Sequence, residues 1–246
     1  MQFQTDGLVI REMTIGESDR LIWILTRERG VVRAFARRAK NYQSSLHAAT
    51  QLLCYSHFKI SEGKDKFMVN EARPIEVFFG LREDLTRLSL AQYFCELAGV
   101  VAVDGLDAAE ILRLVLNALH FLTKNTRPPL LLKGAVELRM LSTAGFMPDL
   151  VACSHCGAYE HPAMVFYPQE GTLLCGECMP PAGGVPVPPG VLTAMRHVVY
   201  SDFEKIFSFT LGEASQQQFA LAAERYVRAT LPQKLPALDF YRSLCG

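Results

Sequence analysis

The chain has 246 residues, half of them hydrophobic and a fifth charged, and its 25 Lys and Arg balance 25 Asp and Glu. This composition argues against a disordered chain and a collagen-like one. The apolar runs, of which 97–103 is among the longest, fall short of the roughly 18 residues that a membrane-spanning helix needs. The opening residues 1–6 do not resemble a signal peptide, so we expect a cytoplasmic protein.

Five segments in the first 75 residues predict strands, because each is short and rich in β-branched or aromatic residues. They are 7–10, 20–26, 31–37, 51–60 and 66–70, and turn signals at 16–19, 27–30 and 62–65 punctuate them. An open sheet of this size would leave its edges exposed. We therefore expect a small closed barrel, for which the OB-fold is the natural candidate.

The periodicity of the apolar residues changes after Pro74. Helical spacing appears in 85–101 and 111–122, and Asp107 is the expected N-cap of the second of these helices. A third helix is expected from the Pro128 and Pro129 pair through Leu141.

Two more helices are predicted nearer the carboxyl end, at 190–199 and from an N-cap at Ser215 to Leu231. The segment between the third helix and these two is rich in Gly, Pro and Cys. The predicted fold class is thus α+β: an N-terminal OB-fold β-barrel at 1–78, followed by an all-helical domain at 79–246 with an inserted four-cysteine zinc module at 148–186.

The cysteines carry the most specific signal in the sequence. Cys153, Cys156, Cys175 and Cys178 form two CxxC pairs separated by eighteen residues, a spacing typical of a zinc ribbon. A disulfide or an iron–sulfur arrangement is the alternative, although cytoplasmic thiols stay reduced. Four thiolates fill a tetrahedral shell and leave no place for an activated water, so we expect one structural Zn²⁺. His155 is expected to point to solvent.

The sequence lacks the GxxxxGK[ST], GxGxxG, GxSxG and HExxH motifs. The histidines outside the cysteine pairs are scattered, with no partnered nucleophile or paired carboxylate near them in the sequence. We therefore expect a binding protein and not an enzyme. A metal site with three protein ligands and a water would instead indicate a zinc enzyme.

Basic residues gather near the amino end of the chain. Between 20 and 40, seven Arg and Lys residues accompany a single acid, Glu28. Such a local excess is typical of a nucleic-acid contact and also of a solvated strand face. The charge pattern alone leaves both interpretations open.

The strand expected at 31–37 carries the candidate nucleic-acid site. Its periodicity places Arg33, Phe35 and Arg37 on one face and the small residues 32, 34 and 36 on the other, which suits the inside of a small barrel. Cations for phosphates and a ring for base stacking are what a single strand of nucleic acid needs. Arg38 and Lys40, with Tyr42, extend this chemistry into the following loop.

The candidate DNA-binding residues are therefore Arg33, Phe35, Arg37, Arg38 and Lys40. In the alternative interpretation Phe35 lies in the core, and the arginines pair with Glu28 or with the helical domain. Trp23 alternates with Leu21 and Leu25 and is predicted to be a core residue.

Segments along nearly the whole chain resemble the RecO family of DNA recombination and repair mediators. They are 6–9, 16–19, 25–26, Gly30, 36–46, 137–141, 145–150, the cysteine pair from Cys153, and 171–175. The family often has glycine where Arg38 stands. The resemblance implies an OB-fold, a helical body and a zinc module, and by position it implies that Arg33, Arg37 and Lys40 contact DNA.

The resemblance also implies a function and a location. The family binds single- and double-stranded DNA, anneals complementary strands, and works with RecR and the single-stranded DNA-binding protein to load RecA. These activities imply a bacterial, nucleoid-associated protein, and the missing nucleotide motif predicts annealing without ATP. The alternative is a zinc-ribbon protein-interaction scaffold with only incidental nucleic-acid contact.

In the family the acidic tail of the coating protein is the partner segment, so an apolar groove rimmed by basic residues is expected on the helical body. The candidates for this rim are Arg113, Lys133, Arg139 and Arg196.

Overall fold

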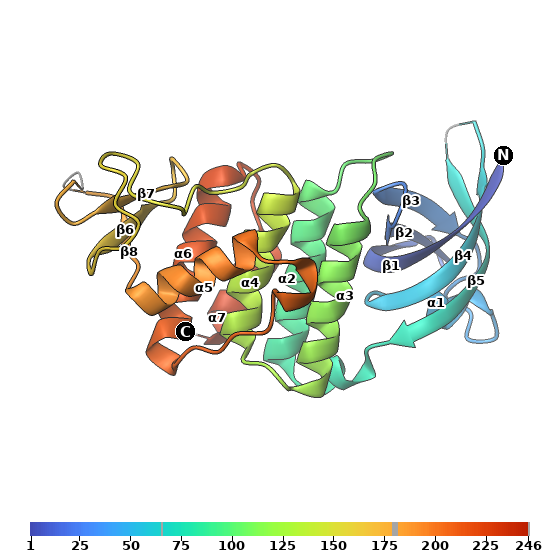
Figure 1. Ribbon diagram of the computed structural model, residues 1–246. Helices are drawn as coiled ribbons and strands as arrows, with labels where there is room; N and C mark the ends of the chain where they lie inside the picture. The colour runs from blue at the N-terminus through green and yellow to red at the C-terminus, as the bar shows by residue number, and fades with distance from the viewer. Residues whose placement is uncertain (65, 179–181, 246) are drawn as a thin grey trace. The chain divides into compact units, whose positions relative to one another are not determined.

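Five strands open the chain, and helices dominate the remainder of the computed structural model, which describes residues 1–64, 66–178 and 182–245 (Figure 1). The chain divides into two units. The first contains residues 1–126 and 235–246, and the second contains residues 127–234. This division groups the first strands with three helices. The domains at 1–78 and 79–246 are defined by element type and stay a prediction.

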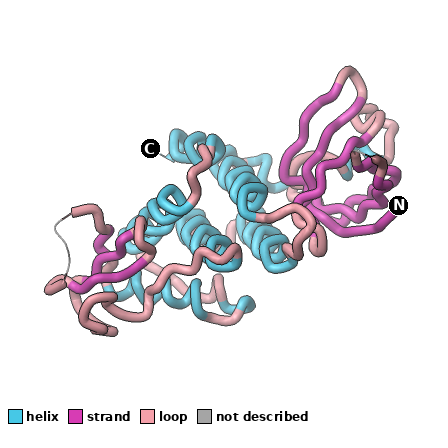
Figure 2. Tube along the Cα trace, turned by 90° about the horizontal axis from the view of Figure 1, so that it is seen from above, coloured by secondary structure: helices cyan, strands magenta, loops and turns pink. Residues whose placement is uncertain are grey.

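The five strands of the first unit close into a barrel with the order β1-β2-β3-β5-β4, as the sequence predicts. The strands are β1 (Gln2–Ile15), β2 (Asp19–Thr26), β3 (Val31–Ala36), β4 (Cys54–Glu62) and β5 (Phe67–Val77). Only the pairing of β3 with β5 is parallel among these strands. A short helix, α1 (Leu46–Ala49), lies in the connection from β3 to β4. Figure 2 shows the barrel strands in magenta from a second direction.

Alternation along the strands builds the barrel core. Val32, Ala34 and Ala36 are buried on the inner side of β3, as their small size predicts, and they pack in one cluster with Ile22 and Phe58. Each large apolar side chain buried in this way contributes roughly 1.5–3 kcal/mol of transfer free energy. The inner face of β3 is thereby fixed, and the residues between these positions must face outward.

Three longer helices complete the first unit: α2 (Leu85–Val101), α3 (Ala109–Lys124) and α7 (Pro236–Cys245). A short 3₁₀ helix, η1 (Phe79–Glu83), precedes α2. The N-cap of α3 is Ala108, so the prediction of Asp107 is wrong by one residue. The Asp107 carboxylate nevertheless accepts a hydrogen bond from the Ala109 N–H at 3.2 Å, which satisfies one of the free donors at the helix start.

The second unit combines helices with a small sheet. Its helices are α4 (Pro129–Thr143), α5 (Pro189–Tyr200) and α6 (Glu213–Thr230), with the 3₁₀ helix η2 (Phe203–Lys205) between the last two. The sheet has the order β7-β6-β8 and consists of β6 (Met164–Tyr167), β7 (Thr172–Cys175) and β8 (Val185–Pro186). In the predicted module at 148–186, residues 179–181 lie outside the described residues.

Helix α6 begins two residues before the predicted N-cap. Its N-cap is Gly212, whose backbone is extended, so Ser215 lies inside the first turn and the prediction is wrong there. Glu213 in that first turn is favourable beside the positive end of the helix dipole. Within the described part of the chain, none of the helices combines the length and the apolar character that crossing a bilayer requires.

Candidate nucleic-acid interface and metal centre

The outer face of β3 carries a cation and an aromatic ring. Arg33 is exposed and Phe35 is half-buried outside the barrel core, so the interpretation of Phe35 as a core residue is wrong. Lys66 places its Nζ 5.8 Å from the centre of the Phe35 ring. Arg37 follows directly after the last residue of β3 and is exposed.

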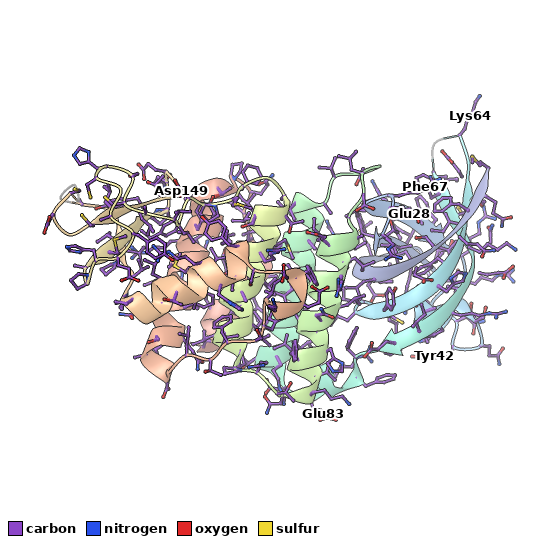
Figure 3. The ribbon with its side chains drawn as sticks, in the orientation of Figure 1. Glu28, Tyr42, Lys64, Phe67, Glu83 and Asp149 are labelled. Atoms are coloured by element: carbon purple, nitrogen blue, oxygen red, sulfur yellow. The ribbon has the colours of Figure 1, made fainter. Side chains whose placement is uncertain are left out.

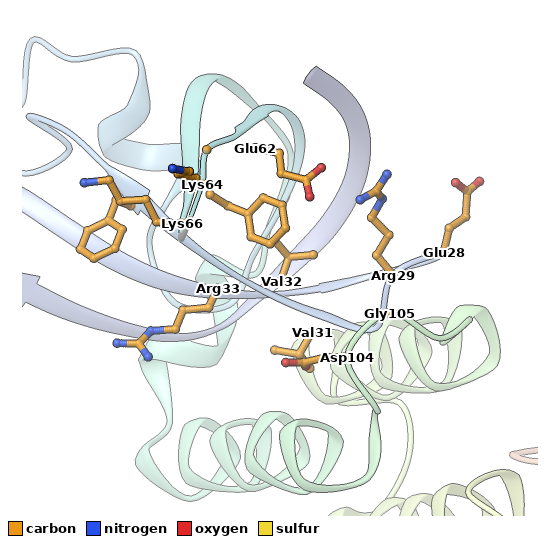
Figure 4. Close-up of a pocket in the computed structure, with 13 residues that line it drawn as sticks. Glu28, Arg29, Val31, Val32, Arg33, Glu62, Lys64, Lys66, Asp104 and Gly105 are labelled. Carbon is orange, nitrogen blue, oxygen red and sulfur yellow. The ribbon is translucent and has the colours of Figure 1, made fainter. Parts of the chain in front are cut away.

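A groove of about 740 Å³ lies beside this face (Figure 4). Its walls come from the β2–β3 turn, the β4–β5 hairpin and the loop from α2 to α3. Basic and acidic side chains both line it, namely Arg29, Arg33, Lys64, Lys66, Glu28, Glu62 and Asp104. Figure 4 shows Arg33 and Lys66 on the side of the groove away from Glu28. Lys64 stands at the tip of the hairpin (Figure 3).

The β2–β3 turn is held in place by the loop that follows α2. The carbonyl of Arg29 accepts a hydrogen bond from the Gly105 N–H at 3.0 Å. Gly30 has a φ of 58°, and a Cβ there would lie 2.0 Å from the Val103 carbonyl oxygen. Because only glycine fits this approach, residue 30 fixes one wall of the groove.

Trp23 lies on the outer face of the barrel, so its prediction as a core residue is wrong. It is half-buried and stands opposite Arg11 on β1 and opposite Arg33 on β3. The Arg11 and Arg33 guanidinium carbons lie 4.6 Å and 5.3 Å from the centre of a Trp23 ring. Its neighbours on the same face, Leu21 and Leu25, are buried as predicted.

The loop after β3 presents exposed cations on a constrained backbone. Arg38 and Lys40 are exposed, and Arg38 has a φ of 53°, in the left-handed region that favours glycine. The Asp19 carboxylate accepts the Arg38 N–H at 2.8 Å. That hydrogen bond, helped by one from Ser18, lowers the pKa of the Asp19 carboxyl. Asp19 therefore stabilises a turn for which the residue at position 38 is unfavourable.

Tyr42 belongs to the same loop and is 88% exposed. Its ring lies 4.7 Å from the His47 ring, centre to centre, and it stands at the outer edge of the barrel (Figure 3). An exposed ring next to a cluster of cations offers a π-face to a nucleic-acid base.

The four cysteines of the CxxC pairs converge, with all their sulfur atoms within 4.8 Å of one another. Strand β7 supplies Cys175, and its N–H donates to the Cys153 Sγ at 3.3 Å. The Cys156 and Cys175 sulfur atoms are 3.7 Å apart. A tetrahedral shell with metal–sulfur bonds of about 2.3 Å separates its sulfurs by about 3.8 Å, whereas a disulfide requires about 2.05 Å. The cluster therefore fits a metal ion and does not fit a disulfide.

The ionisation of these thiols also suits a metal site. Burial raises the pKa of Cys153, but the N–H groups of Cys156, Cys175 and His155 outweigh it and lower that pKa to about 6. The side chain of Cys175 raises the pKa of Cys178 to about 12, since two neighbouring thiols resist losing both protons. A bound cation replaces the protons and offsets the repulsion between neighbouring thiolates. The four thiols together are therefore suited to hold one metal ion.

Arg139 and Arg196 are not free to form the predicted basic rim, because they bind backbone carbonyls. Arg196 donates to the carbonyls of Leu150, Val151 and Tyr159 at 2.7, 2.8 and 2.8 Å. It thereby ties the segments on both sides of the first CxxC pair to α5. Arg139 donates to carbonyls at the end of α5, those of residues 198, 199 and 201.

Lys133 also fails the rim prediction, because its side chain is only 2% exposed and its Nζ lies 2.8 Å from a Glu137 carboxylate oxygen. Arg113 alone of the four candidates is exposed. It lines a second groove, of about 490 Å³, with residues of β1 and α3.

Comparisons with known proteins agree with the resemblance. The family model described as Recombination protein O N terminal matches residues 1–78, and Recombination protein O C terminal matches residues 82–239. A protein of Acetivibrio thermocellus named DNA repair protein RecO is 34% identical over 242 residues, covering 98% of this chain and 96% of its own length. A protein of the same name from Symbiobacterium thermophilum is 30% identical over 246 residues, with coverages of 98% and 97%. The chain belongs to the RecO family of DNA repair proteins.

Proposed function

We propose that this protein is a recombination mediator that binds single- and double-stranded DNA through the outer face of its barrel. Family membership supports a role in DNA repair. The observation that carries the proposal is the outward position of Arg33 and Phe35 on β3, with exposed cations continuing into the loop at Arg37, Arg38 and Lys40. Cations neutralise phosphates and release their counterions, while the ring accepts a base of any sequence.

The proposed activity is annealing of complementary strands without ATP, followed by help in loading RecA onto coated single-stranded DNA together with RecR. Holding two strands on one protein raises their effective concentration, so pairing is accelerated with no covalent step and no nucleotide. The protein would therefore act without catalysis. The partners proposed from the family resemblance are RecR and the acidic tail of the single-stranded DNA-binding protein.

We further propose that the metal is a single structural Zn²⁺ held by Cys153, Cys156, Cys175 and Cys178. Thiolates in a tetrahedral set of four favour zinc, and such a set leaves no position for substrate. When bound, the ion supplies cohesion between the two CxxC turns. It would contribute to DNA binding only by keeping this part of the second unit folded.

The replacement Arg37→Ala tests the DNA site. We expect weaker binding to all sequences and a slope of log affinity against log salt that is shallower by roughly 0.7–0.9, because one phosphate contact is lost. Fluorescence anisotropy of a labelled oligonucleotide over a range of salt concentrations measures both quantities. Arg73→Ala is the matched control, since Arg73 is an exposed arginine on β5 outside this site and should leave both quantities unchanged.

An unchanged affinity and slope for Arg37→Ala would remove this residue from the site. Annealing of complementary strands, naked or coated, is then measured with and without ATP. Annealing that is equal in both conditions is expected. Binding to coated strands with none to naked strands would instead favour the scaffold interpretation.

A further inference from the structure

We propose that Trp23 stacks on a base of single-stranded nucleic acid. It belongs to a row of five residues on the outer face of the barrel, here called the band, that would bind this single-stranded nucleic acid. The members of this band are Arg11, Trp23, Arg33, Phe35 and Lys66. The proposal rests on the proposed function and extends its site from β3 and the following loop to β1, β2 and the start of β5. It also defines the preferred substrate as single-stranded nucleic acid.

The strand register creates the first part of the band. Trp23 is paired with Arg11 across β1 and β2, and with Arg33 across β2 and β3, so the three residues form one row across three strands. Neighbouring strands lie about 4.8 Å apart, which places the two arginine backbones about 10 Å from each other with the indole between them. A base on the indole would therefore have a guanidinium within reach of the phosphate on either side.

The second part of the band continues the alternation of cation and ring. Arg33 and Phe35 share the outer face of β3, and Phe35 is paired with Met68 on β5. Lys66, just before the start of β5, holds its Nζ 5.8 Å from the centre of the Phe35 ring. The two rings are thus separated by Arg33 and bounded by cations at both ends.

The charges of the band are available to a polyanion. Among the described residues, Arg11, Arg33 and Lys66 take part in none of the ion pairs. The carboxylate next to Arg11 in the sequence, that of Glu12, lies 3.6 Å from Arg20. Unpaired cations on a protein surface attract phosphates. Acids also line the neighbouring groove, and Figure 4 shows one of them, Glu28, on the side away from Arg33 and Lys66.

The Trp23 ring lies outside the core cluster of the barrel. A guanidinium over an indole is a favourable cation–π pair, and it keeps the ring at the protein surface while the inner positions of β2 are filled by Ile22 and Ile24. An unpaired base offers the same ring an extended π-face. In a duplex the bases are already stacked on their neighbours, so they offer no free face on which the indole could stack. Single strands should therefore engage Trp23 and duplexes should not.

The chain has a single tryptophan, so fluorescence excited on the long-wavelength side of the tyrosine absorption reports on this residue alone. The full-length protein is titrated with an oligothymidine longer than the roughly 4–16 nucleotides that one OB-fold covers, and with a blunt duplex of equal length. We expect saturable quenching by the oligothymidine and little quenching by the duplex. Anisotropy of the labelled oligonucleotides, measured in parallel, gives the binding itself.

Trp23→Ala should weaken oligothymidine binding by about 5- to 150-fold, as expected for the loss of one stacked base. Trp23→Phe keeps a ring and should retain more of the affinity than Trp23→Ala does. Phe79→Ala is the matched control, because Phe79 is also an exposed ring with an arginine, Arg82, 5.5 Å from its centre, but it lies outside the band. It should bind like the parent protein.

Three results would overturn the proposal: oligothymidine binding without a change in fluorescence, equal quenching by the duplex, or parental affinity in a folded Trp23→Ala variant. Each of these leaves DNA binding by the protein intact. Absence of binding by either readout would instead contradict the proposed function itself, so the two failures are distinguishable.

Discussion

Cys153→Ser is expected to release the metal ion and to unfold the segment that the cysteines hold together. Cys153 is buried in this cluster, its sulfur accepts the Cys175 N–H, and serine offers a much poorer ligand. Structural zinc sites of this kind contribute about 10–16 kcal/mol, far more than a three-stranded sheet of short strands can supply by packing. Native mass spectrometry measures the metal content, and limited proteolysis measures the exposure of β6–β8.

Cys245→Ser is the matched control, because Cys245 is an exposed thiol outside the cluster, and it should keep one metal ion per chain. Treatment of the parent protein with a chelator should reproduce the Cys153→Ser proteolysis pattern. Acidification should also lower the affinity for the metal ion, since binding requires that the thiols lose their protons. A folded, protease-resistant Cys153→Ser protein without metal would contradict the structural role of the ion.

Lys133→Ala should destabilise the protein by about 3–5 kcal/mol, because it removes one partner of a buried ion pair. The Lys133 Nζ lies 2.8 Å from Glu137 on the same helix and 3.0 Å from Glu224 on α6, and the Glu137 side chain is fully buried. Taking away the ammonium leaves a carboxylate in a low-dielectric interior. Urea denaturation followed by circular dichroism measures the loss as a lower midpoint of the transition of this unit.

Two controls separate loss of the charge pair from loss of packing. Lys133→Met combined with Glu137→Leu replaces the buried pair by apolar side chains and leaves Glu224 its second partner, Arg228, at 3.1 Å, so this variant should lie close to the parent in stability. Lys205→Ala breaks an exposed pair with Asp202 and should leave the midpoint nearly unchanged. Equal destabilisation by the single and double replacements in α4 would show that the ion pair is not the cause.

The barrel and the cluster of four cysteines could be predicted from the sequence for a physical reason. Both depend on short-range patterns: alternation sets the inner face of β3, where Val32, Ala34 and Ala36 lie, and the CxxC spacing brings two thiols to one side of each turn. Helix positions follow in the same way from apolar periodicity. The first residues of the helices do not follow from it. Asp107 and Ser215 are residue types that favour the N-cap position, but the structure has Ala108 and Gly212 there.

The residues that sequence reasoning missed depend on contacts between strands. Alternation places Trp23 and Leu21 on the same face, but it does not say which of the two is covered. The row of Arg11 and Trp23 depends on a register shift in β1 between Val9 and Arg11, which the sequence does not reveal. Likewise Lys66 reaches Phe35 only because β3 pairs with β5 in parallel.

The burial of the charged Lys133 side chain could not be predicted from the sequence either. Lys133 is a surface candidate by residue type, and Glu137 four residues later is typical of an exposed helical pair. The packing of α6 against α4 encloses both, as the 2.5 Å between a Cβ at Gly134 and the Phe219 ring indicates. Such enclosure requires knowledge of the neighbouring helix.

The central claim is that the outer face of the barrel holds single-stranded DNA. Photocrosslinking of an oligothymidine that carries 5-iodouracil, followed by mass spectrometry of the digested protein, locates the contact directly. We expect adducts on Trp23 or Phe35, and fewer adducts when unlabelled oligothymidine competes. Adducts confined to residues 127–234, with none between 1 and 78, would contradict the account.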